Sequence, residues 1–363
     1  MRLTVMPRAM QPTADVPAPS LSGRPYAPSF ANRLLQAARL DRRRGWLVYA
    51  ALALTAVALE LAIGWAEGTI PARATLMHVV LPLFAFTALP ALAFFNRVGE
   101  RAMATARPVL VDDERGYETL SYRLTTLPAG PTLFAAVGGL LLFALLTAVR
   151  PADTFERLQI FVTPVASVIE AVLQFLAWSG IGVLIFEVGR KLWIIDEIYR
   201  RHLRINVLSP GPLYAFARLA GAMVAFAAVF GAVGMLALAE LATTAQGLAL
   251  ATVPTTIAAI GFVAPLWGAH RLMAQARTLN VDALGARIEA TIVALREQVD
   301  QNDLASVGPL KDALEGLIAA RDEYLRVSTW PWQGSTLGAV VTALGVPLAV
   351  WLLTRLIEET TLL

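Results

Sequence analysis

Five polar residues stand inside long apolar runs of this sequence, where polar side chains are costly and usually serve a function. They are Glu60, His78, Ser167, Glu170 and Gln174. The last three follow one another at helical spacing, so they share one face of a helix. Carboxylate, imidazole, hydroxyl and amide groups gathered at one depth could receive a cationic or hydrogen-bonding ligand. The alternative is a structural network in which Glu60 or Glu170 is protonated or paired within the protein.

A second set of residues forms a narrow stripe of small side chains in the last apolar run, 336–357. Its members recur at steps of three and four residues and lie on one helix face: Ser335, Gly338, Thr342, Gly345 and Ala349. Small faces let membrane helices pack closely, which is their commoner use. The same face, repeated around a symmetry axis, could instead line a narrow pore whose hydroxyls hydrate a passing ion.

The segment Trp330, Pro331 and Trp332 directly precedes this run. Indole rings favour the headgroup zone of a bilayer, and the proline prevents one helix from continuing through the segment. An interfacial anchor accounts for these residues, and a gating hinge is the further hypothesis.

The residue patterns of common enzymes are missing from the sequence. It contains no Gly-rich phosphate loop, no paired-His metal helix and no nucleophile elbow. The absence of cysteine excludes disulfides, thiol catalysis and thiolate metal sites. His202 and His270 stand beside arginines at predicted helix ends, where interfacial or capping roles are expected. We therefore expect no enzymatic activity, no cofactor and no bound metal.

The composition of the chain indicates a membrane protein, so the candidate residues lie on or between membrane helices. With 57% hydrophobic residues, 16% charged residues and a mean hydropathy of +0.61, the chain is too apolar for a soluble domain of this length. A membrane helix needs roughly 20 apolar residues. Seven runs qualify: 45–65, 75–95, 132–149, 163–188, 215–241, 247–269 and 336–357. The sequence predicts an all-α multi-pass membrane protein with seven transmembrane helices.

The basic residues predict the orientation, because Lys and Arg in short loops mark the cytoplasmic side. An N-terminus inside and a C-terminus outside place all but four of the 30 basic residues in the cytoplasm or just inside a helix. The net charge of +3 and pI near 9.4 then reflect this bias, so we expect membrane lipid and no nucleic acid as a partner. This orientation puts the five polar residues in the outer half of the bundle. We expect the bundle to lie in the plasma membrane, and the Ala-, Arg- and Leu-rich composition of the chain suggests a bacterial protein.

The chain divides into four predicted parts. Residues 1–32 read as a disordered tail, 33–269 as a six-helix bundle with cytoplasmic loops, 270–329 as a cytoplasmic helical hairpin, and 330–363 as the hinge and seventh helix. The fourth and sixth helices are expected to extend beyond the bilayer on the cytoplasmic side. Each half of the hairpin has one apolar stripe, so it needs a partner, either the fourth helix or another subunit.

This layout resembles the insect odorant and gustatory receptors, and the chain looks like a remote, prokaryotic-style member of that seven-transmembrane ion-channel superfamily. The resemblance is one of layout and covers about residues 38–363. It implies that the cytoplasmic ends, about 270–326, anchor four subunits together. It also implies that residues 335–349 line a central cation pore and that the outer half of the earlier helices holds a ligand cavity.

The leading hypothesis from the sequence is a homo-oligomeric, ligand-gated cation channel, with a tetramer favoured and its small-molecule ligand arriving from outside. One alternative is a non-conducting scaffold or sensor that recruits a cytoplasmic partner through the hairpin. Another is a transporter in which Glu60 and Glu170 couple the movement of protons or cations.

Overall fold

A computed structural model describes residues 24–38, 45–68, 76–149, 163–204, 208, 210–237, 245–332 and 334–361 of the chain. In these residues the regular structure is helical, and β pairing is confined to two isolated bridges, Pro28 with Pro128 and Leu110 with Leu203. The predicted all-α class is confirmed for this part of the chain.

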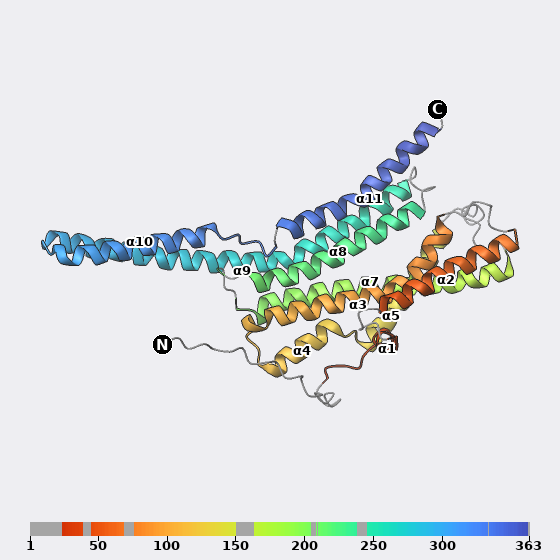
Figure 1. Ribbon diagram of the computed structural model, residues 1–363, viewed down its shortest axis with the longest axis horizontal. Helices are drawn as coiled ribbons and strands as arrows, with labels where there is room; N and C mark the ends of the chain where they lie inside the picture. The colour runs from red at the N-terminus through yellow and green to blue at the C-terminus, as the bar shows by residue number, and fades with distance from the viewer. Residues whose placement is uncertain are drawn as a thin grey trace, which may run out of the picture.

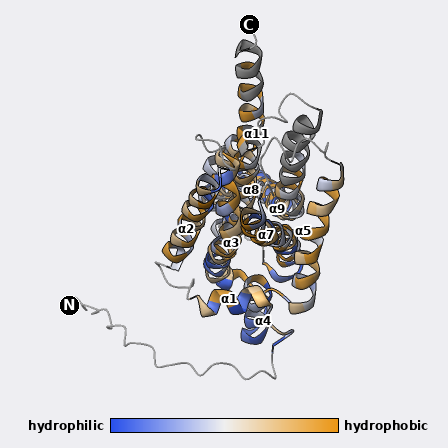
Figure 2. Ribbon diagram, turned by 90° about the vertical axis from the view of Figure 1, so that its right-hand side faces the viewer, coloured by the Kyte–Doolittle hydropathy of each residue, from blue (hydrophilic) through white to orange (hydrophobic). Residues whose placement is uncertain are grey.

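Six helices of the described part are long and apolar enough to cross a membrane. They are α2 (Gly45–Ala66), α3 (Met77–Ala106), α5 (Ala129–Val149), α7 (Pro164–Glu197), α8 (Gly211–Ala237) and α11 (Gly334–Thr361). At 1.5 Å per residue, about 20 residues cross the 30 Å hydrocarbon layer. In Figure 2 apolar residues dominate α2 and α5, whereas the short α4 (Glu114–Thr125) is largely hydrophilic. The protein is a multi-pass membrane protein.

The predicted run 247–269 is helical but is not among these six helices. It forms the first part of α9 (Ala245–Asp300), a helix of 56 residues that continues without interruption into the charged stretch. Seven spans therefore remain a prediction, as do the sides on which the termini lie and the identity of the membrane.

A helical hairpin follows, as the sequence predicted. The chain turns at Asn302, whose positive φ of 58° places it in the left-handed region, and returns as α10 (Leu304–Arg326). Figure 1 shows α10 and the second half of α9 projecting from the remaining helices as an antiparallel pair. Among the described residues from 274 to 330, none is buried.

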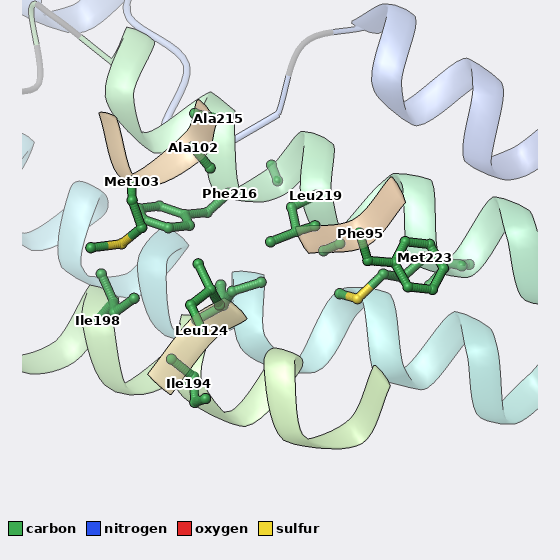
Figure 3. Close-up of a cluster of buried hydrophobic side chains, with 14 of the residues drawn as sticks. Phe95, Ala102, Met103, Leu124, Ile194, Ile198, Ala215, Phe216, Leu219 and Met223 are labelled. Carbon is green, nitrogen blue, oxygen red and sulfur yellow. The ribbon is translucent and has the colours of Figure 1, made fainter. Parts of the chain in front are cut away.

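The core lies between α3, α7 and α8. Figure 3 shows how Phe95 and Met103 of α3 meet Phe216, Leu219 and Met223 of α8, with Ile194 and Ile198 nearby.

On the other side of α7, two glycines let α5 approach very closely. A Cβ atom on Gly139 would lie 2.0 Å from the Trp178 carbonyl oxygen, and one on Gly182 would lie 2.1 Å from that of Ala135. These contacts fix α7 in the middle of the bundle.

The end of the predicted tail differs from expectation. Residues 1–23 lie outside the described part, but residues 24–32 are placed and pack against the bundle. Ser29 caps α1 (Phe30–Ala37), whose Ala31 and Leu35 are buried. The Tyr26 hydroxyl donates a hydrogen bond to the carbonyl oxygen of Thr126 at 2.7 Å. These polar contacts and the apolar face of α1 order a segment whose composition suggested disorder.

Candidate cation site between α2, α3 and α7

Three of the five predicted ligand-binding residues meet in the structure. Glu60 of α2, His78 of α3 and Glu170 of α7 each offer one ligand atom, and these atoms all lie within 4.8 Å of one another. All three residues are buried, with exposed fractions of 6%, 2% and 4%. Two carboxylates and one imidazole from three helices thus face a common point inside the bundle.

The helix directions explain why these side chains lie at the same depth. Glu60 lies six residues before the end of α2, His78 is the second residue of α3, and Glu170 is the seventh residue of α7. The chain reverses between α2 and α3, so the end of the first helix is next to the beginning of the second. Helix α7 begins at this same end of the bundle and packs against both of the others.

An apolar layer closes the site one helical turn further into the bundle. Leu81, Leu173 and Ala177 are buried against one another, and Ala56 packs against them. Leu81 follows His78 by three residues, Leu173 follows Glu170 by three, and Ala56 precedes Glu60 by four, so each helix contributes to both layers. The polar groups are therefore separated by apolar side chains from the deeper part of the bundle.

The Glu60 carboxylate is the group whose surroundings are incomplete. Both of its oxygens are buried and accept no hydrogen bond from the described residues. Burying a polar group without a hydrogen-bond partner costs roughly 1–3 kcal/mol, and more when the group is charged. A bound cation or a proton on the carboxylate would remove this cost.

The other two predicted residues lie close by in different roles. Gln174 is buried one turn after Glu170, and its Oε1 accepts a hydrogen bond from Trp178 Nε1 at 3.0 Å. Ser167 is partly exposed, and its hydroxyl donates to the Thr163 carbonyl of its own helix.

A polar contact between α2 and α7 lies two turns closer to the helix ends. Thr163, the N-cap of α7, donates its hydroxyl hydrogen to the carboxylate of Glu67. Thr163 precedes Glu170 by seven residues, and Glu67 follows Glu60 by seven. A spacing of seven residues returns a helix to nearly the same face. This contact holds the two helices together above the site.

The predicted pore-lining stripe is exposed. Every one of its residues is exposed on α11: Ser335, Gly338, Thr342, Gly345 and Ala349. The helix packs instead through Thr336 and Val340, which approach Gly221 of α8, and through the buried Ala343. Close packing within the chain, the first interpretation of the stripe, is therefore not its use in the described structure.

The predicted hinge is an aromatic stack against α9. Trp330 stacks on His270 with ring centroids 4.0 Å apart and on Trp332 at 4.3 Å, and Trp332 stacks on Phe262 at 5.6 Å. His270 Nδ1 also lies 3.2 Å from the carbonyl oxygen of Thr329. The segment that joins α10 to α11 is thereby attached to the continuous helix beside it.

A buried ionic network at the other end of α7 was not predicted. Lys191 and Glu187 have fully buried side chains 2.8 Å apart, and Arg190 also pairs with Glu187 at 3.1 Å. Lys191 Nζ donates to Asn96 Oδ1 at 2.9 Å, and Arg190 Nη2 donates to the Tyr26 hydroxyl at 2.6 Å. Burial raises the pKa of Tyr26 above its usual value, although Arg190 acts in the opposite direction. The sequence feature that could have indicated this network is the presence of Glu187, Arg190 and Lys191 at the end of the apolar run 163–188.

No protein-family model, no curated protein and no solved structure matches this chain.

Proposed function

We propose that several copies of this chain form a cation channel whose pore is lined by α11. The observation that carries the proposal is the exposed stripe of small residues on that helix. Ser335 and Thr342 supply hydroxyl groups, and Gly338 and Gly345 leave room beside them. No described side chain lies within 4 Å of the position that a Cβ atom would take on either glycine.

The remaining surface of α11 makes this stripe distinctive. Large apolar residues, Val341, Leu348 and Leu352, are exposed on a neighbouring face and suit contact with lipid. Small and hydroxyl side chains make little favourable contact with lipid. They instead allow close approach between helices or hydration of an ion. Helix α11 therefore has one face for α8, one for lipid and one for further copies of itself around a pore.

The hairpin supports assembly from several copies. Two paired helices that each have one apolar stripe are only marginally stable in water without a further partner. Apolar residues of this hairpin stay exposed, among them Leu279, Val293, Val299, Ile318 and Leu325. The end of α7 was one predicted partner, and it lies beside Gly261 and Gly268 of α9, before the hairpin begins. Pairing between hairpins of neighbouring subunits would cover these residues, as the resemblance in layout to the insect receptors also implies.

Electrical recording tests the pore directly. We expect Thr342→Leu and Gly345→Leu to reduce or abolish the single-channel conductance of the purified protein in planar bilayers, because a bulky apolar side chain narrows and dries the pore. Val341→Leu is the matched control, since it changes an exposed position on the lipid face of the same helix. Unchanged conductance in Thr342→Leu and Gly345→Leu would remove α11 from the pore.

Cation transport by the buried cluster is a second candidate, and the meeting of Glu60, His78 and Glu170 favours it. Carboxylates in a bundle core commonly carry protons or cations across membranes. This function predicts saturable cation uptake into proteoliposomes that is lost in Glu170→Gln. Single-channel currents that persist in the same variant would instead favour the channel.

A further inference from the structure

The cluster of Glu60, His78 and Glu170 has the donor atoms of a metal site. Zn²⁺ and similar ions bind imidazole nitrogen and carboxylate oxygen at about 2.0–2.2 Å, which places the donor atoms around one ion roughly 3–4.4 Å apart. The three donor atoms lie within 4.8 Å of one another. Side-chain rotations that move these atoms by about 1 Å or less would bring all three within bonding distance of one ion.

Charge and burial favour a divalent ion at this point. Two carboxylates repel each other strongly in a medium of low dielectric constant, and a doubly charged cation between them removes that repulsion. Glu60, whose two buried oxygens accept no hydrogen bond from the described residues, independently indicates that a ligand belongs in the cluster. The apolar layer formed by Leu81, Leu173 and Ala177 limits the water that competes for the ion.

The donor set selects a class of metal. Imidazole is a poor partner for Mg²⁺ and Ca²⁺, which prefer ligands that are all oxygen, whereas it suits Zn²⁺, Fe²⁺, Co²⁺ and Ni²⁺. Thiolate ligands are excluded because the chain contains no cysteine. We propose that Glu60, His78 and Glu170 bind one divalent first-row transition metal ion, joining α2, α3 and α7. This differs from the expectation of no metal drawn from the sequence, and it does not depend on conduction through α11.

Metal binding by the purified full-length protein in detergent tests the proposal, with Zn²⁺ as the probe. Equilibrium dialysis followed by mass spectrometry of the metal content should give one tightly bound Zn²⁺ per chain. Glu60→Gln and His78→Gln should each weaken binding at least tenfold, because each removes one ligand. Both substitutions preserve side-chain size closely enough to keep the bundle folded, which size-exclusion chromatography and circular dichroism would check.

The chain offers matched controls for both ligand types. Glu100→Gln changes an exposed carboxylate of α3, on the same helix as His78 but 22 residues away, and His202→Gln changes a histidine that lies 2.8 Å from Asp112. Both variants should keep the affinity of the unchanged protein. The proposal is overturned if the unchanged protein binds no Zn²⁺, or if either control weakens binding as much as the ligand variants.

X-ray absorption at the zinc edge of the unchanged protein gives a second result that needs no substitution. One imidazole nitrogen among oxygen neighbours is expected, and a site without imidazole would contradict the assignment. Binding and conduction can fail separately, because the zinc measurements need no current and the recordings of Thr342→Leu need no zinc.

Discussion

At the residue scale, the central feature is the contrast between two buried clusters on α7. At one end Glu170 joins Glu60 and His78, and Glu60 lacks a hydrogen-bond donor among the described residues. At the other end Glu187 is paired with both Lys191 and Arg190. The ion pairs of Glu187 stabilise the contact between α7 and the chain before α5, whereas Glu60 lies against no cationic side chain in the described ion pairs and gives its cluster the character of a binding site.

The buried ion pair leads to a prediction about stability. Lys191→Met should lower the free energy of unfolding by about 3 kcal/mol, because it leaves Glu187 buried with one cationic partner instead of two. Unfolding in detergent, followed by circular dichroism, measures this loss. Lys311→Met is the control, since its partner Glu315 is 3.7 Å away and both are exposed, so about 0.5 kcal/mol or less is expected. Equal losses in the two variants would contradict a structural role for Lys191.

At the element scale, the contact between α5 and α7 depends on two glycines. Gly139→Ala should destabilise the protein by about 1–3 kcal/mol, because its Cβ would overlap the Trp178 carbonyl oxygen and force the helices apart. At Gly138, one residue earlier, an added Cβ atom would have no neighbour within 4 Å. Gly138→Ala should therefore leave the stability unchanged or raise it slightly. Thermal unfolding of the two variants measures the difference, and a tolerated Gly139→Ala would show that the helices are further apart than described.

At the scale of the whole molecule, the exposed face of α11 leads to a prediction about assembly. The chain has no cysteine, so a single introduced thiol is unique. Thr342→Cys should form disulfide-linked dimers in membranes under mild oxidation, because the proposed pore brings this position close to other copies of the chain. Val341→Cys, on the face proposed to contact lipid, should form few.

The size of the particle tests the same assembly independently. Native mass spectrometry is expected to show four copies of the chain, as the proposed channel requires. A monomer, together with equal cross-linking of Thr342→Cys and Val341→Cys, would exclude the channel and favour a non-conducting scaffold.

The sequence by itself determined the local features of this protein. Runs of about 20 apolar residues require membrane helices, and the helical period placed Ser335 to Ala349 on one face of α11. The turn near Asn302 and the continuous α9 follow from the same local rules. Each depends on residues within a few helical turns, which is the range over which hydrogen bonding and periodicity act.

The tertiary structure alone decided which helices are neighbours. Glu60, His78 and Glu170 come from three separate helices, and periodicity within one helix does not show that they meet. The partners of Lys191 and the ordering of residues 24–32 were likewise hidden, because both depend on contacts with distant parts of the chain. Helix packing depends on complementary surfaces such as the pair Gly139 and Gly182, and that complementarity appears only when both helices are in place.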